Sequence, residues 1–232
     1  MNNEIFYSRT QLLLGEESIE KLKSSTVLVC GVGGVGGYVA EALIRIGVGT
    51  IIFADSDKTD ASNLNRQILA TKDTIGVPKV ISAVSRGESI NTDGKYIPLE
   101  IFLTPQNIPE ILDKYSPDCV TDAIDNVTAK VSLAVECQNR NIPLIASMGT
   151  GNKTDPTRFK VTDIYKTSVC PLARTMRKLL KEKGIKELKV LYSDEIPQKN
   201  NGLIGTLSYV PAVAGLLIAS EVVKTLLSEI KN

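Results

Sequence analysis

The sequence predicts an α/β fold with a mostly parallel, doubly wound sheet, and two observations lead to this fold class. Short apolar runs, such as residues 27–30 and 50–54, alternate along the chain with longer segments of helical periodicity. The first apolar run is followed directly by Gly31, Gly33 and Gly36 in the spacing G-x-G-x-x-G. A strand, a glycine turn and a helix in this order are typical of a Rossmann-like nucleotide-binding sheet.

The remaining elements follow from the same patterns. The predicted strands are residues 27–30, 50–54, 96–99, 119–121, 144–147, 159–162 and 189–191. The predicted helical segments are residues 4–25, 35–46, 80–90, 106–114, 127–140, 171–183 and 211–230. We expect one domain over residues 1–232, with a nucleotide-binding core in 1–150. Residues 151–232 then form a substrate-binding extension that adds antiparallel strands and carries a long polar loop at 193–208.

Composition limits the chemistry. The chain has a formal net charge of +1, so overall charge neither requires nor excludes a nucleic-acid partner. Histidine is absent, which excludes His-based triads, His general bases and His metal ligands. Any reaction therefore depends on carboxylates, Lys, Arg, backbone amides, a thiol or a bound metal.

The cysteines and the apolar segments indicate a cytoplasmic protein. No C-x-x-C pair is present, so the spacing offers no structural zinc site, and we expect buried free thiols. Residues 1–11 are polar and lack the apolar core of a signal peptide. Residues 200–220 are free of charge, but their Asn, Gly, Pro and Ser content favours a loop and a core helix over a membrane span. The cysteines are Cys30, Cys119, Cys137 and Cys170.

The glycine loop is predicted to hold a phosphate. Gly31 allows the tight turn after the strand, Gly33 lets the backbone approach an anion, and Gly36 lets the helix pack closely. Gly34 belongs to the same loop. The pattern indicates the phosphate of a nucleotide without saying which nucleotide, and a turn that serves packing alone remains an alternative.

Residues at later strand ends favour a triphosphate over NAD. Asp55 ends the second predicted strand, where an acceptor for ribose hydroxyls belongs. The segment "SNLNRQ" (62–67) follows, and Lys79 comes 13 residues after Arg66. A hydride-transfer site does not need this set, whereas Arg and Lys neutralise triphosphate oxygens and a pyrophosphate leaving group. Asp125, after the fourth strand, is a candidate Mg²⁺ ligand at the same edge. Each charged residue taken alone is better explained by a solvated surface, whereas the set at successive strand ends favours a joint role.

These motifs resemble the adenylating domain of the ubiquitin-activating-enzyme-like superfamily, which includes the MoeB and ThiF proteins. The resemblance covers about residues 5–150 through "GVGGVGG", "DSDKTDASNLNRQ", Lys79 and "DAIDN". It implies that ATP adenylates a carboxylate and that pyrophosphate is released. It also implies that Asp55 binds ribose, that Asp125 binds Mg²⁺, and that Arg9 reaches the ATP of the partner subunit in a homodimer. The residues that it implies for the phosphates are Asn63, Arg66, Gln67 and Lys79.

The carboxy-terminal part resembles the tRNA threonylcarbamoyladenosine dehydratases. The matching stretches are "DPTRFKVTDIYKTSVCPLARTMRKLLKEKGI" (155–185) and "KVLYSDE" (189–195). The resemblance implies an ATP-dependent dehydratase that cyclises N6-threonylcarbamoyladenosine in tRNA, with sulfur-transfer proteins as candidate further partners. The two zinc pairs of MoeB- and ThiF-like proteins are missing, and Cys170 is not taken as a catalytic thiol. Some members carry a membrane-anchoring tail, which we do not expect here.

A local excess of positive charge also favours a tRNA substrate. Residues 172–190 hold seven basic and two acidic side chains. In helical geometry four of the bases fall on one face, which suits a phosphate backbone, although without the resemblance a solvated face explains them better. These are Arg174, Arg177, Lys178 and Lys181. Two other functions stay open: an adenylating activator of a ubiquitin-like sulfur-carrier protein, and a non-catalytic ATP-binding module.

Overall fold

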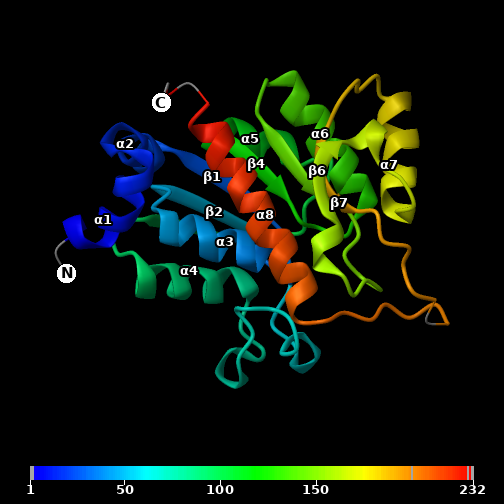
Figure 1. Ribbon diagram of the computed structural model, residues 1–232, viewed down its shortest axis with the longest axis horizontal. Helices are drawn as coiled ribbons and strands as arrows, with labels where there is room; N and C mark the ends of the chain where they lie inside the picture. The colour runs from blue at the N-terminus through cyan, green and yellow to red at the C-terminus, as the bar shows by residue number, and fades with distance from the viewer. Residues whose placement is uncertain (1–2, 200, 229, 231–232) are drawn as a thin grey trace.

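A computed structural model of the chain describes residues 3–199, 201–228 and 230 (Figure 1). The strands are β1 (Thr26–Cys30), β2 (Thr50–Asp55), β3 (Lys95–Glu100), β4 (Cys119–Asp122), β5 (Leu144–Ser147), β6 (Phe159–Asp163) and β7 (Lys189–Ser193). The α-helices are α1 (Asn3–Leu14), α2 (Glu16–Ser24), α3 (Gly36–Ile46), α4 (Lys79–Ile90), α5 (Ile108–Tyr115), α6 (Val127–Asn139), α7 (Pro171–Glu182) and α8 (Tyr209–Leu226). The short 3-10 helices are η1 (Ala61–Asn63), η2 (Lys72–Thr74), η3 (Pro156–Arg158) and η4 (Ile164–Lys166).

The strands form one sheet in the order β3-β2-β1-β4-β5-β7-β6. Every predicted strand is present within two residues of its expected bounds. All neighbouring pairs are parallel except β6 and β7, which confirms the mostly parallel, doubly wound sheet. Of the two carboxy-terminal strands only β6 runs against the common direction of the sheet. Helix α7 lies between β6 and β7 in the chain, and β7 runs parallel to β5 and antiparallel to β6.

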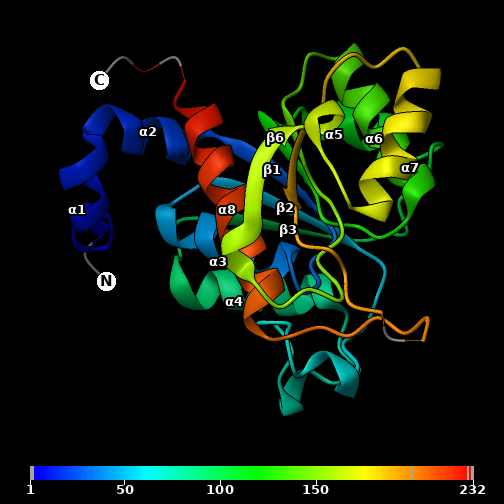
Figure 2. The same ribbon diagram turned by 45° about the vertical axis from the view of Figure 1, so that its right-hand side comes forward.

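Helices cover both faces of the sheet, which explains why its strands are apolar without alternation. Leu28 and Cys30 of β1 belong to a core with α5, α6 and α7. Val27 and Val29 of the same strand face the opposite core, with α3, α4 and α8. Figures 1 and 2 show these two helical layers on either side of the strands. The order of the strands leaves the carboxyl ends of β1, β2 and β4 adjacent at one edge.

The amino-terminal segment is helical, as predicted, but it divides into α1 and α2 at Gly15, whose φ is 78°. Tyr7 of α1 is buried against Gly47, and its hydroxyl accepts a hydrogen bond from Asn91 Nδ2 at 3.3 Å. Leu12 and Leu13, by contrast, are 79% and 87% exposed. One side of α1 therefore packs against the ends of α3 and α4 while the other presents apolar side chains.

The last helix, α8, packs against α3, and 44% of its residues are buried. Val210, Ile218 and Val222 belong to the core, as expected for a core helix. By length and hydropathy alone, α8 is also the one described helix that could cross a membrane. It begins two residues before and ends four residues before its predicted bounds, 211 and 230.

All four cysteines are buried free thiols, as predicted. Burial raises the pKa of Cys119 and of Cys137 to about 12, because an apolar environment disfavours the thiolate. Cys170 immediately precedes α7 and is 2% exposed. These thiols are packing residues in the part of the chain that the structure describes.

Candidate functional site

A cavity of about 290 Å³ lies at the carboxyl edge of the sheet, where the ends of β1, β2 and β4 meet. Ligands of open α/β sheets bind at this edge. A larger hollow of about 1020 Å³ lies near the amino ends of β5 and β7, and no predicted site residue lines it. We therefore take the smaller cavity as the functional one. The predicted residues that line it are Gly31, Gly33, Asp55, Asn63, Arg66, Gln67, Lys79 and Asp125.

The glycine loop forms the floor of this cavity. Gly31 has a φ of 81°, and a Cβ there would lie 2.8 Å from the carbonyl oxygen of Ala123. At Gly36, a Cβ would lie 1.7 Å from the carbonyl oxygen of Gly31, so no other residue fits this turn. Gly36 starts α3, whose amino-terminal amides have no side-chain cap and suit an anion. Gly34, in contrast, packs against Pro211.

Asp55 is held at the end of β2 by two backbone amides. Its Oδ2 accepts a hydrogen bond from Val32 N–H and its Oδ1 accepts one from Asp57 N–H, each at 2.8 Å. A carboxylate oxygen can accept more than one hydrogen bond, so both oxygens retain capacity for hydroxyl donors. The glycine loop and Asp55 are thereby locked to one another beside the cavity.

The predicted phosphate-binding residues meet on one wall. Lys79 is the first residue of α4, is 6% exposed, and donates from Nζ to Asp57 Oδ2 at 2.7 Å. The Asn63 side chain also closes a capping box with Asp60. Arg66 is half-buried, and its Nη1 donates to the carbonyl oxygen of Ser62 at 2.8 Å. Sequence reasoning did not find Asp57, although it lies only two residues after Asp55.

The opposite wall is apolar and was also missed. Ile101, Phe102 and Leu103 follow β3, and Ile124 and Ala129 flank the end of β4. Phe102 is 57% exposed. The only sequence feature that could have predicted this wall is that β3 ends at the same edge of the sheet as β2. A flat apolar wall facing a polar one suits a base on one side and phosphates on the other.

Asp125 lies in the turn between β4 and α6 and is exposed toward the cavity. The neighbouring Asn126 caps α6, because its Oδ1 accepts the Ala129 amide at 2.9 Å. Asp125 is therefore not the helix cap. The other carboxylate of "DAIDN", Asp122, is fully buried and pairs with Lys130 of α6 at 2.9 Å. Burial raises the pKa of Asp122, and the Lys130 ammonium opposes that rise.

Arg9 does not join this cavity within one chain. It is exposed on α1 and lines a separate hollow of about 540 Å³ together with Leu13, Ile46 and Leu216. The carboxylates of the nucleotide cavity and the Arg9 guanidinium therefore belong to different surfaces of the same chain.

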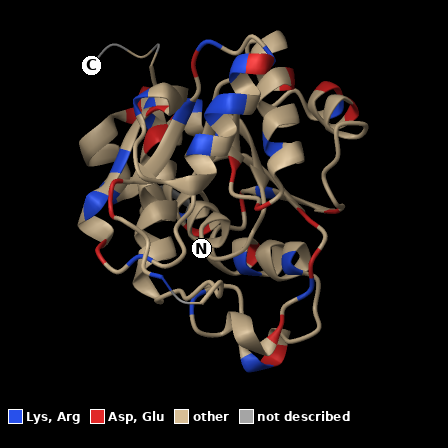
Figure 3. Cartoon of the chain, turned by 90° about the vertical axis from the view of Figure 1, so that its right-hand side faces the viewer, with Lys and Arg blue, Asp and Glu red and all other residues tan. Residues whose placement is uncertain are grey.

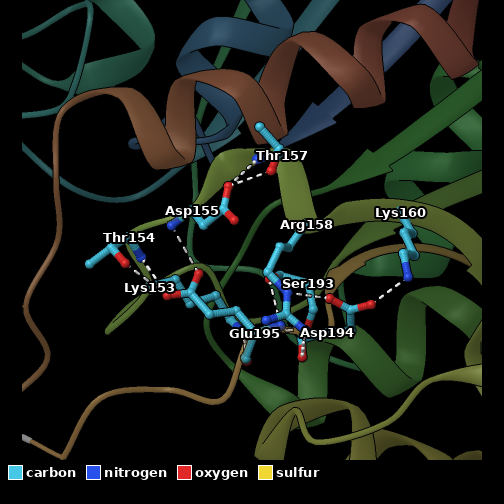
Figure 4. A network of polar contacts seen from close by, with 9 residues as sticks. All are labelled: Lys153, Thr154, Asp155, Thr157, Arg158, Lys160, Ser193, Asp194 and Glu195. Carbon is cyan, nitrogen blue, oxygen red and sulfur yellow. Dashed lines mark hydrogen bonds and ion pairs between the residues drawn. The ribbon is translucent and has the colours of Figure 1, made fainter.

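A polar network holds the start of the 193–208 loop (Figure 4). The buried Lys153 donates from Nζ to the carbonyl oxygens of Glu195 at 2.7 Å and Ser193 at 3.3 Å, and burial lowers its pKa. The Glu195 carboxylate accepts the amides of Thr154 at 2.8 Å and Asp155 at 3.0 Å. The first residues of the loop are thus fixed to the turn after β5.

The described part of the 193–208 loop, which was predicted to be polar, also presents apolar side chains to solvent. Ile196, Leu203 and Ile204 are each at least 75% exposed. The loop extends past the sheet and returns to α8 (Figure 1). Asn152 accepts the Gly205 amide at Oδ1 (2.7 Å) and donates its own amide to the Gly205 carbonyl oxygen (2.8 Å). The far end of the loop is therefore also tied to the turn after β5.

The predicted basic face of α7 contains three residues rather than four. Arg174, Lys178 and Lys181 are exposed. Arg177 is half-buried and donates from Nη1 to the backbone oxygen of Thr167 at 3.1 Å, and it also contacts the Thr167 hydroxyl. Figure 3 shows the side of the molecule that carries α7, with basic positions on several elements and acidic positions among them.

Comparisons with known proteins agree with this geometry. Residues 7–232 match the model of the ThiF family. The chain is 42% identical to the tRNA threonylcarbamoyladenosine dehydratase of Bacillus subtilis, covering 97% of this chain and 96% of that protein. It is 38% identical to the Escherichia coli enzyme of the same name over 75% of this chain and 65% of that protein.

Solved structures extend the likeness to the whole fold. A crystal structure of the E. coli dehydratase TcdA in complex with AMP matches with a TM-score of 0.92 and 31% identity, covering 97% of this chain and 95% of that one. A structure of TcdA in complex with ATP matches with a TM-score of 0.91 over the same shares. The match of the family model and the near-complete alignment with the B. subtilis relative together show that the chain belongs to the ThiF family.

Proposed function

We propose that this protein is an ATP-dependent tRNA threonylcarbamoyladenosine dehydratase. The observation that carries the proposal is the cavity at the carboxyl edge, where the glycine loop, Asp55, Lys79 and Asp125 converge. The chain around this cavity aligns over nearly its full length with a dehydratase of B. subtilis. Residues 1–150 supply the nucleotide-binding core, and residues 151–232 supply the substrate-binding extension.

ATP fits the cavity as a substrate. The apolar wall with Phe102 receives the adenine, and Asp55 receives the ribose hydroxyls. The α3 amino-terminus and the basic wall face the phosphates, where Lys79 and Arg66 neutralise charge on the β- and γ-phosphates. NAD would leave this basic wall without an anion to bind.

The adenylation step needs no general base, in agreement with the absence of histidine. The threonyl carboxylate of the modified base is already ionised and attacks the α-phosphorus, so that pyrophosphate leaves and an acyl-adenylate forms. The carbamoyl group of the same base then attacks the acyl carbon and loses a proton, and AMP leaves. The base closes into a ring with net loss of one water. The protein positions the reactants and stabilises charge on the leaving groups.

Mg²⁺ is the expected companion of ATP, and Asp125 suits it. Mg²⁺ is usually held by one or two carboxylates together with substrate phosphates and water. Asp125 makes no hydrogen bond or ion pair with other described residues and faces the cavity. Clusters of three or more candidate metal ligands are absent from the described residues, which is consistent with a metal that arrives with the nucleotide. Mg²⁺ would supply positive charge to the triphosphate.

A homodimer would bring Arg9 to the second active site. Leu12 and Leu13 of α1 and Leu216 of α8 leave an apolar surface exposed around Arg9. Burial of this surface against a second copy is favourable. The exposed bases of α7 are the proposed contact for tRNA phosphates. We expect a cytoplasmic enzyme without a membrane partner, and sulfur-transfer proteins are candidate further partners.

The decisive experiment supplies Mg-ATP with one of three substrates. These are tRNA carrying threonylcarbamoyladenosine, the same tRNA without it, and a ubiquitin-like carrier protein ending in Gly-Gly. AMP release should require the modified tRNA, and its nucleoside should lose the mass of one water. AMP formation with the carrier protein alone would assign the chain to the sulfur-carrier activators. ATP binding without turnover of any substrate would leave a non-catalytic module.

A further inference from the structure

A fully buried ion pair lies directly beneath the turn that carries Asp125. Asp122 ends β4, Lys130 lies in the second turn of α6, and both side chains are 0% exposed. Lys130 Nζ donates to Asp122 Oδ1 at 2.9 Å and to the carbonyl oxygen of Ile124 at 3.1 Å. The amide of Ile124 donates back to Asp122 Oδ1 at 3.2 Å. The amide and the carbonyl oxygen of Ile124 are thus both hydrogen-bonded to this pair.

The residues on either side of Ile124 are held as well. The Ala123 amide donates to the carbonyl oxygen of Cys30 at 2.8 Å, beside the glycine loop. Asn126 caps α6. Asp125 is the one residue of this turn whose side chain is exposed and lies against the cavity. The direction of its carboxylate therefore depends on a backbone that the buried pair fixes.

Stability alone does not explain this pair. Removal of two charges from water is costly, and well-packed apolar residues in place of a buried pair are often equally stable or more so. Asp122 Oδ2 also has no hydrogen-bond partner among the described residues, so the carboxylate is incompletely satisfied. Such a pair is better explained by the conformation that it specifies than by the stability that it contributes.

We propose that Lys130 and Asp122 are positioning residues, whose ion pair fixes the turn of residues 123–126 so that the Asp125 carboxylate enters the nucleotide cavity. This inference rests on the proposed function, because it assigns the pair to the adenylation site. The pair itself touches no substrate. It acts through Ile124, whose side chain also forms part of the apolar wall.

The test replaces both charges at once, because removal of either partner alone leaves an unpaired buried charge that can prevent folding. The variant is Asp122→Asn with Lys130→Met, which keeps the approximate size of both side chains. A matched control, Asp113→Asn with Arg140→Met, removes a partly exposed ion pair at the other end of α6, together with the contact between Arg140 and Glu136. Thermal melting, ATP binding with and without Mg²⁺, and the kcat and KM of pyrophosphate exchange are measured for both.

The Asp122/Lys130 variant should fold and bind ATP in EDTA like the parent. Its gain in ATP affinity from Mg²⁺ and its kcat should each fall roughly 10-fold, the size seen when residues that orient a metal ligand are removed. The Asp113/Arg140 control should keep the gain in ATP affinity from Mg²⁺ and the kcat of the parent. A folded Asp122/Lys130 variant with the full Mg²⁺ effect and full kcat would overturn the proposal. Failure of the parent protein to bind ATP at all would instead overturn the proposed function.

A second measurement needs no variant. In the parent protein without nucleotide, the amide of Ile124, which donates to Asp122, should already be protected from hydrogen exchange, because the pair organises the turn in advance. Rapid exchange of this amide that slows only when ATP is added would show that the nucleotide orders the turn, and would contradict the proposal even if the double variant fails to fold.

Discussion

Lys79 Nζ lies 2.7 Å from Asp57 Oδ2, and both residues line the nucleotide cavity. The Lys79 side chain is 8% exposed, whereas the Asp57 side chain is 66% exposed. The ammonium is therefore held inside the wall, and its partner is the more exposed group of the pair. A phosphate that enters the cavity would therefore meet a lysine ammonium whose position is already fixed.

Replacement of Lys79 by Ala should therefore remove a preorganised phosphate donor. Hydrogen bonds to charged groups contribute about 1.5–3 kcal/mol, so ATP affinity should fall by roughly 10- to 100-fold. Calorimetric titration with Mg-ATP measures this change. Lys72→Ala, at an exposed lysine of η2 outside the cavity, is the matched control and should bind ATP normally. Unchanged ATP affinity in Lys79→Ala would show that this lysine does not face the phosphates.

Asp125→Asn should leave stability unchanged and abolish adenylation. The helix cap is Asn126, so Asp125 has no capping role to lose, and an amide is a weaker ligand than a carboxylate for a hard cation. The contrasting variant, Asn126→Ala, should lose about 1 kcal/mol of unfolding free energy. Pyrophosphate exchange and urea denaturation separate the two effects. Full exchange activity in Asp125→Asn would exclude it as the Mg²⁺ ligand.

The elements and the polar wall of the cavity were predictable because each depends on local sequence. Continuous apolar runs mark buried parallel strands, and the glycine spacing marks a turn that no other residue can make. Asp55 and Asp125 were expected at one edge because strand ends of a parallel sheet converge there, and both line the cavity. Lys79, the first residue of α4, was placed beside them by the family resemblance.

The missed features depend on how consecutive elements fold against one another. The pairing of Asp122 with Lys130 requires α6 to fold back over the end of β4. The inward turn of Arg177 depends on Thr167, which precedes α7. Helical spacing places Arg177 beside the exposed bases, but only tertiary packing decides whether the guanidinium reaches solvent or a backbone oxygen.

Arg9 should act on the ATP of the second subunit. Within one chain it lies on a different surface from the nucleotide cavity, and the apolar residues around it suit a second copy. A mixture of Arg9→Ala chains with Lys79→Ala chains should regain part of the activity that each variant lacks, because one of the two sites in a heterodimer is intact. The activity is assayed after heterodimers have been confirmed by differential tags. Heterodimers without any rescue would place Arg9 outside the reaction.

Asp194 should contribute acid-sensitive stability at the start of the 193–208 loop. Lys160 and Arg158 bind its carboxylate and lower its pKa from 3.8 to about 2 (Figure 4). Because the folded pKa lies below the unfolded one, this stabilisation is complete above the unfolded pKa and is lost as pH falls toward the folded pKa. Asp194→Asn should therefore be less stable than the parent at neutral pH, and the difference should shrink between about pH 4 and pH 2.

Urea denaturation at a series of pH values measures this difference. Asp73→Asn is the control, because Asp73 is exposed in η2 and forms no ion pair with the described residues. Its stability difference from the parent should stay nearly constant over the same range. A constant difference for Asp194→Asn as well would show that the contacts with Arg158 and Lys160 do not contribute to folding.

Charge reversal on α7 should weaken tRNA binding while ATP binding is retained. The variant combines Arg174→Glu, Lys178→Glu and Lys181→Glu, and it leaves Arg177 in place because that side chain anchors Thr167. Each phosphate contact that is lost should reduce the slope of log affinity against log salt by about 0.7–0.9. The control reverses the same number of exposed charges elsewhere, at Lys72, Lys95 and Lys114. If both variants bind modified tRNA equally well at every salt concentration, α7 is not the docking surface. A loss confined to the α7 variant, with unchanged ATP affinity, assigns the phosphate contacts to this helix.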